Sequence, residues 1–156
     1  MTKTPDNQHC RRIIQARERL QLRPQEVANA ISMNRPSYWD LETVEDEIAN
    51  AVCLRQIVAL CNLLKLSPWE LFTGFAQAND SEQTMNAQAL VQLIPDHLIA
   101  KKLTLPEFED KVGWRVEEVL SNPDLALESW GLDCLRNVCA ELGVNWLVVL
   151  ESHFSP

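Results

Sequence analysis

Glycine is scarce in this sequence, and its scarcity bears on both the chemistry and the fold. Only four of the 156 residues are glycines, and none of them builds the glycine-rich loop that cradles a phosphate group. No segment alternates β-branched with polar residues over the length of a strand. The sequence therefore predicts an all-α protein.

Motifs of catalysis and of metal binding are missing as well. The chain has no nucleophile elbow and no His-Glu-x-x-His pattern. Adjacent acids such as Glu117 and Glu118 point in different directions from a helix. The cysteines are odd in number and contain no CxxC pair: Cys10, Cys53, Cys61, Cys134 and Cys139. We therefore expect no enzyme, no cofactor and no metal site.

Long hydrophobic runs are also absent. No apolar stretch approaches the ~20 residues that a membrane-spanning helix needs. The polar segment from Met1 to Gln8 lacks the apolar centre of an export signal. Reduced cysteines then agree best with a reducing compartment. We expect a cytoplasmic protein that makes no contact with a membrane.

Charge is unevenly distributed along the chain. The net charge of −8 opposes simple binding to a polyanion. Residues 1–43, however, carry seven basic and five acidic side chains, a net of +2, which leaves −10 for the remainder. A mildly basic N-terminal part can still present one positive face to a nucleic acid.

The most informative feature that is present is an internal repeat. The segment Leu22-Arg23-Pro24-Gln25-Glu26-Val27 is matched 81 positions later by Leu103-Thr104-Leu105-Pro106-Glu107-Phe108. Further along, the offset shortens to 78, and the apolar series Ile57, Leu60, Cys61, Leu64, Leu66 is matched by Leu135, Val138, Cys139, Leu142, Val144. A repeat of this length predicts two copies of one helical unit.

Helical periodicity and capping residues divide each copy into five helices. In the first copy we expect helices over 8–21, 24–31, 35–42, 50–64 and 69–72, with an acidic loop over 43–49. In the second copy we expect them over 87–102, 105–112, 115–121, 128–142 and 146–152. The predicted domains are 9–73 and 87–153, and the polar residues 74–86 form a linker.

Several residues of the first copy share one register. Arg17 lies near the end of its first helix, and Val27-Ala28 lie in its second. Ile31-Ser32-Met33 form the turn, and Tyr38, Leu41 and Glu42 end the third helix. This register resembles that of the phage-repressor, or xenobiotic-response-element, family of helix-turn-helix regulators. The resemblance covers about residues 11–72 and, more faintly, 90–150, and it implies tandem five-helix lambda-repressor-like units.

The resemblance also implies a function, that of a sequence-specific DNA-binding transcriptional regulator. The helix at about 35–42 would enter the major groove of double-stranded DNA, with a homodimer on a palindromic site. Base contacts would come from Arg35, Ser37, Trp39 and Asp40. Phosphate contacts would come from Arg11, Arg12, Arg19 and Arg23. Arg17 and Glu42 would form a structural ion pair between the first and third helices.

The sequence departs from the family pattern at several positions. Pro24 stands where the family has a DNA-contacting glutamine, and Glu45-Asp46-Glu47 follow the third helix. In the second copy, Glu109 replaces the small alanine and Pro123 replaces the helix-ending glutamate. Residues 90–150 carry five basic and ten acidic side chains, a net of −5. We expect the second unit to act in packing or dimerisation.

Two alternatives to a simple DNA-binding regulator remain open. The first is a protein–protein interaction module that has kept the fold and lost DNA binding. An exposed indole at Trp39 would be typical of an interface anchor. The second is an antitoxin-like repressor that binds both DNA and a protein partner.

Overall fold

All regular elements of the structure, a computed structural model, are helices. The structure describes residues 8–77 and 84–155, and within these ranges the only pairing of extended backbone is an isolated bridge between Cys53 and Gly131. The expected all-α class is confirmed. No helix in the described part of the chain combines the length and the apolarity required to cross a bilayer. Residues 78–83 of the expected 74–86 linker lie outside the described residues.

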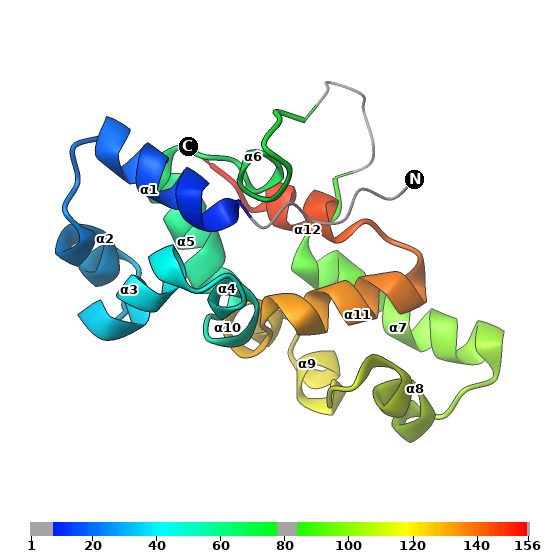
Figure 1. Cartoon of the computed structure of the whole chain (residues 1–156). Coiled ribbons are helices and arrows are strands. Elements are labelled where there is room, and N and C mark those ends of the chain that lie inside the picture. Colours follow the sequence, from blue (N-terminus) through cyan, green and yellow to red (C-terminus); the bar gives the residue numbers. More distant parts are fainter. Residues whose placement is uncertain (1–7, 78–83, 156) are drawn as a thin grey trace.

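The first set of helices precedes that gap. It comprises α1 (His9–Arg19), α2 (Pro24–Ala30), α3 (Arg35–Thr43), α4 (Glu47–Asn50), α5 (Leu54–Leu64) and α6 (Pro68–Thr73). α1 packs on α3, α5 and α6, while α2 packs on α3 and α5. In Figure 1, α2 and α3 lie at one end of the molecule.

The second set follows the gap. It comprises α7 (Ala87–Lys101), α8 (Leu105–Val112), α9 (Glu117–Ser121), the 3-10 helix η1 (Pro123–Leu125), α10 (Ala126–Ser129), α11 (Leu132–Leu142) and α12 (Trp146–Ser152). α7 packs on η1, α10 and α11, and α8 packs on α11. In Figure 1, α7 and α8 lie at the end of the molecule opposite to α2.

Backbone conformation repeats between the two sets. Left-handed residues with positive φ occur at Gln21, Ser32 and Lys65, with φ of 56°, 58° and 52°. The corresponding residues in the second set, at the sequence offsets of 81, 81 and 78, also have positive φ: Lys102, Gly113 and Gly143. Residues other than glycine rarely adopt this conformation. Its recurrence at these offsets shows that the two sets share their turns as well as their sequence pattern.

Four helix N-termini have the side-chain caps that the sequence predicts. The side chains of Asn34, Ser67, Thr104 and Asn145 each accept a hydrogen bond from a backbone N–H in the first turn of the following helix. Such bonds satisfy N–H groups that have no partner within the helix. Pro24 and Pro68 each occupy a first helical turn, as expected.

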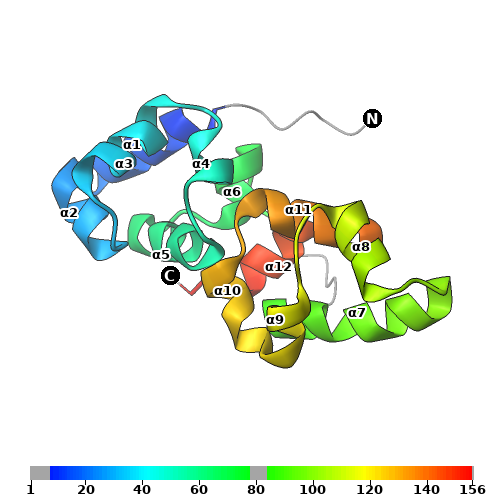
Figure 2. The same ribbon diagram turned by 90° about the horizontal axis from the view of Figure 1, so that it is seen from below.

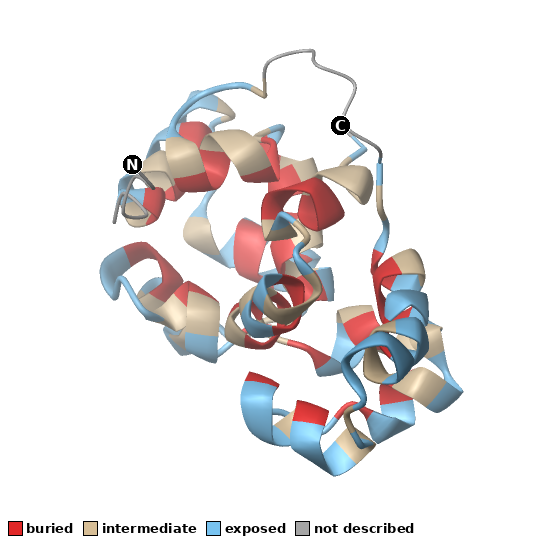
Figure 3. Ribbon diagram, turned by 90° about the vertical axis from the view of Figure 1, so that its right-hand side faces the viewer, coloured by how far each residue is buried: buried red, intermediate tan, exposed pale blue. Residues whose placement is uncertain are grey.

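The two sets pack against each other through corresponding elements. α5 contacts α10, α4 contacts α11, and α6 contacts α12. The Leu54 N–H donates to the Trp130 carbonyl at 2.8 Å, next to the Cys53–Gly131 bridge. Figure 2 shows α5, α10 and α11 between α1–α3 and α7–α8. Buried residues of both sets form one continuous core, and the buried stretches of the ribbon are marked in Figure 3.

Three expected element boundaries at this junction are wrong. The expected acidic loop 43–49 contains the start of α4, and the next helix begins at Leu54 rather than after a cap at Asn50, which instead ends α4. The expected helix 128–142 is broken at Trp130 and Gly131. Residues 53 and 131 pair as extended backbone, which a helix running through either of them could not provide. A contact between the two sets therefore overrides the local helical pattern.

Candidate nucleic-acid interface

The sharp turn between α2 and α3 is built by local residues. Ser32 adopts φ of +58°, and the Met33 N–H donates to the Ala28 carbonyl at 2.9 Å. Ala28 and Val27 are fully buried where α2 crosses its neighbours. A small residue at such a crossing allows two short helices to approach closely. The turn leaves the N-terminal ends of α2 and α3 exposed on one surface.

A buried polar cluster fixes α3 on α1. The Arg17 Nε donates to Glu42 Oε1 at 2.6 Å, and a second guanidinium nitrogen donates to Oε2 at 3.2 Å. The Tyr38 hydroxyl donates to Glu42 Oε1 at 2.6 Å. Arg17 also donates to the Leu22 carbonyl at 3.1 Å, at the start of the link to α2. The structural ion pair expected between Arg17 and Glu42 is thus present, and it connects three segments.

The charged side chains of this cluster are largely buried. The Glu42 side chain is 4% exposed and the Arg17 side chain 12% exposed. Burial, together with the adjacent Glu42 carboxylate, raises the pKa of Tyr38 well above its usual range. The hydroxyl therefore stays protonated and remains a donor. The bond to Glu42 also raises the pKa of Arg17, which stays cationic.

A surface depression lies between the N-terminal ends of α2 and α3. Its lining consists of Arg23, Pro24, Gln25, Glu26, Asn29 and Arg35. Two guanidinium groups and two side-chain amides therefore border one concave surface, together with a single carboxylate. Arginine and amide side chains are the groups that most often bind phosphates and base edges.

The single carboxylate of this depression, that of Glu26, already binds Arg23. Glu26 Oε2 accepts the Arg23 backbone N–H at 2.6 Å, and Oε1 lies 3.7 Å from the Arg23 guanidinium. The backbone hydrogen bond is the main cause of the lowered pKa of Glu26. Its negative charge caps α2 and is partly balanced by Arg23.

Gln25 and Asn29 are site residues that sequence reasoning missed. The Gln25 amide donates to the Asn29 side-chain oxygen at 2.7 Å, and both residues are exposed on α2. Their i, i+4 spacing places them on one helix face. That spacing of two amide side chains is visible in the sequence and is the signal that identifies them.

The four residues expected to contact bases lie on or beside the exposed side of α3. Arg35 and Trp39 are exposed, and the Trp39 side chain is 60% accessible to solvent. Ser37 and Asp40 are half-buried. The Ser37 backbone N–H donates to the Asn34 cap at 2.8 Å, which leaves its hydroxyl as the group available for a further contact.

The four arginines expected to contact phosphates do not lie together. Only Arg23 lines the depression with Arg35. Arg12 donates to the Leu71 carbonyl of α6 at 3.0 Å. Arg19 lies seven positions further along α1, hence on the same helix face as Arg12 and not on the face that meets α3. Arg11 is exposed on α1.

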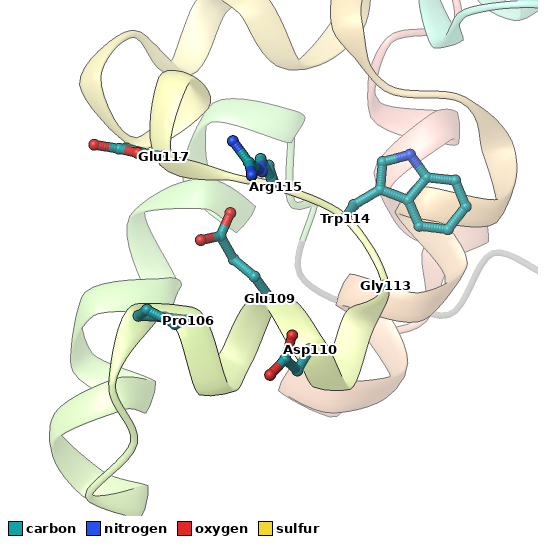
Figure 4. A pocket seen from close by; sticks show the side chains of 7 residues that line it. All are labelled: Pro106, Glu109, Asp110, Gly113, Trp114, Arg115 and Glu117. Atoms are coloured by element: carbon teal, nitrogen blue, oxygen red, sulfur yellow. The ribbon is translucent and has the colours of Figure 1, made fainter.

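The corresponding region of the second set is acidic. A depression there is bordered by Pro106, Glu109 and Asp110 of α8 and by Trp114, Arg115 and Glu117 near the start of α9 (Figure 4). Glu109 Oε2 accepts the Val116 N–H at 2.8 Å, so this carboxylate supports the turn into α9. The shared helix arrangement thus carries opposite charge in the two sets.

Cys134 and Cys139 are both fully buried on α11. Burial raises the pKa values of Cys134 and Cys139 to about 12, so both thiols are protonated near neutral pH. Within residues 8–77 and 84–155, no three His, Cys, Asp or Glu side chains are grouped so that they could hold a metal ion.

Comparison with known proteins found no relative of this chain. No family model, no curated protein and no solved structure matches this chain at a significant level. The likeness to repressor-type regulators is therefore a resemblance in the sequence register alone.

Proposed function

We propose that this chain is a sequence-specific DNA-binding regulator of transcription that inserts α3 into the major groove. The observation that carries the proposal is the surface shared by the starts of α2 and α3. There, Arg23, Arg35, Gln25 and Asn29 border one depression on a helix pair joined by a tight turn. A helix-turn-helix of the repressor type, in tandem with a second unit of the same plan, is the arrangement that this surface and the sequence register favour.

Each group has a role that follows from its chemistry. Arg35, at the first position of α3, would bind a guanine edge in a bidentate manner or a neighbouring phosphate. Ser37, Trp39 and Asp40 would lie along the groove beyond it. Arg23 and the amides of Gln25 and Asn29 would hold the phosphate backbone beside α2.

The buried cluster of Arg17, Glu42 and Tyr38 supports this role indirectly. A helix that reads bases must be held firmly in place, because a side chain displaced by a fraction of a hydrogen-bond length no longer distinguishes one base from another. The three side chains hold the C-terminal half of α3 on α1. They would act as positioning residues and would not touch DNA.

The distribution of charge favours a single DNA-binding helix in each chain, namely α3. The start of α9 carries Glu117 and Glu118, both exposed, and phosphates would repel them. The α5–α6 surface of the first set is already covered by α10–α12 of the same chain. A homodimer on a palindromic site would therefore pair through a different surface, and a single chain would bind an unpaired half-site.

A double variant tests the base-reading role. Arg35→Ala with Ser37→Ala should abolish preference for the selected sequence while changing the thermal midpoint little, because Arg35 is exposed and the backbone of Ser37, not its hydroxyl, bonds to the Asn34 cap. Arg115→Ala is the control, since it removes an exposed arginine from the equivalent turn of the second set. Selective binding that survives in the double variant would contradict the assignment of α3.

The phosphate role of Arg23 has a different signature. Arg23→Ala should weaken binding to all duplexes alike and reduce the slope of log affinity against log salt by about 1. A loss confined to one sequence would instead make Arg23 a base reader.

An interaction module of the same fold, or an antitoxin-like repressor, is the second candidate. The observation that favours it is the 60% exposure of Trp39, because large indoles at a surface often anchor protein interfaces. Trp39→Ala should then abolish partner binding, whereas Arg35→Ala, which should weaken DNA binding, should leave partner binding intact.

A further inference from the structure

A second concave surface lies beside Trp114, away from the proposed DNA-binding surface. One depression is bordered by Glu109, Asp110 and Glu117 (Figure 4). Another lies at the junction of the two sets, between residues 49–53 and Ser129–Gly131. Trp114 borders both depressions and is 40% exposed. The two depressions and the indole between them are called the Trp114 groove below.

The first depression has carboxylates without a compensating partner. Three carboxylates and one guanidinium, that of Arg115, give its lining a net charge of −2. Among the described residues, the side chains of Asp110 and Glu117 form neither an ion pair nor a hydrogen bond with another group. In Figure 4, Trp114 and Glu117 stand at opposite edges of the depression. These charges face an open concavity that would attract a cation.

A single metal ion does not fit the arrangement. No three acidic, histidine or cysteine side chains in the described part of the chain converge closely enough to hold an ion. A ligand that uses these carboxylates must instead extend across them and carry more than one positive group. Polypeptide segments rich in arginine or lysine meet this requirement.

The second depression has no charged side chain in its lining. Ala49, Ala51, Val52 and Cys53 line it together with the polar side chains of Asn50 and Ser129. The indole of Trp114 adds a flat apolar wall, which can also hold a cation over its face. A ligand that continues from the acidic depression past Trp114 would therefore place a small uncharged side chain here.

We propose that the Trp114 groove binds an extended, basic segment of a partner protein, with arginine or lysine side chains at Asp110 and Glu117 and a small uncharged side chain at the junction. This site does not depend on DNA binding by α3. It is the acidic counterpart of the Arg23–Arg35 depression on the same helix arrangement, so the two sets would bind partners of opposite charge.

The test uses the full chain and a displayed library of random peptides. Selection should enrich peptides with two basic residues near a small uncharged one. The selected peptide, labelled for fluorescence anisotropy, is then titrated with three variants. Asp110→Asn with Glu117→Gln should weaken its binding about tenfold at low salt. Trp114→Ala should weaken it by a similar factor, and Arg115→Gln should strengthen it.

The matched control is Asp96→Asn with Glu18→Gln, which removes the same charge from exposed positions that do not border the groove. It should change the affinity less than twofold at the same salt concentration, because exposed charges act only weakly beyond contact distance. Equal losses in both double variants would overturn the proposal, since the binding would then depend on overall charge. Selection of neutral or acidic peptides, or full binding by the Trp114→Ala variant, would overturn it as well.

Discussion

Removing the carboxylate of Glu42 should destabilise the folded protein far more than removing an exposed carboxylate. Glu42 accepts hydrogen bonds from Arg17 and from the Tyr38 hydroxyl while it is 4% exposed. In Glu42→Ala, the Arg17 guanidinium stays in a mostly buried position without its counterion, and the Tyr38 hydroxyl loses its acceptor. Breaking a buried pair in this way costs about 3 kcal/mol.

Urea denaturation followed by tryptophan fluorescence measures this cost. With a slope of about 2 kcal/mol per molar urea, the transition midpoint should fall by about 1.5 M. Glu128→Ala is the control, because Glu128 pairs with Arg55 at 2.7 Å where the two side chains are 53% and 61% exposed. That pair should contribute less than about 1 kcal/mol. Equal shifts for the two variants would refute the claim that the Glu42 cluster is energetically distinct.

Three further predictions concern the turns, a histidine and the junction. Lys65→Gly should stabilise the protein by about 0.5–1 kcal/mol in urea denaturation, because Lys65 has φ of +52° where the second set has Gly143; a loss of stability would contradict this. Burial lowers the pKa of His9 below 6.5, so the unfolded chain binds more protons and the free energy of unfolding should decrease as pH falls through about 6.5. His9→Phe should flatten this dependence between about pH 7 and pH 5, and an unchanged slope would argue against a buried, neutral His9. A fragment of residues 1–77 should lose stability and self-associate, since it exposes the α5–α6 surface that α10–α12 cover; a monomer in sedimentation, as stable as the full chain, would show that the junction matters little.

Local features could be predicted from the sequence because they depend on neighbouring residues. Asn34, Ser67, Thr104 and Asn145 cap helices within their own first turns. The αL turn at Ser32 and the Arg17–Glu42 pair follow from the register of α1–α3. Such features need no information about distant parts of the chain.

Features at the junction could not be predicted in the same way. The helix breaks at Cys53 and at Trp130–Gly131 arise because the two segments pair with each other, although they are 78 positions apart. The contact of Arg12 with the Leu71 carbonyl depends on how α6 docks on α1. Helical periodicity identifies Arg12 only as a basic residue of the first helix. It cannot show that Arg12 binds the Leu71 carbonyl while Arg23 lines the depression with Arg35.

The central claim is most directly tested by selection from a pool of random DNA duplexes at two salt concentrations. The proposed function predicts enrichment of a short motif, with affinity that falls steeply as salt rises because phosphate contacts release counterions. The Arg35→Ala, Ser37→Ala variant should no longer enrich that motif. If the wild-type chain retains no duplex even at low salt, that result would contradict the claim and favour the protein–protein interaction module.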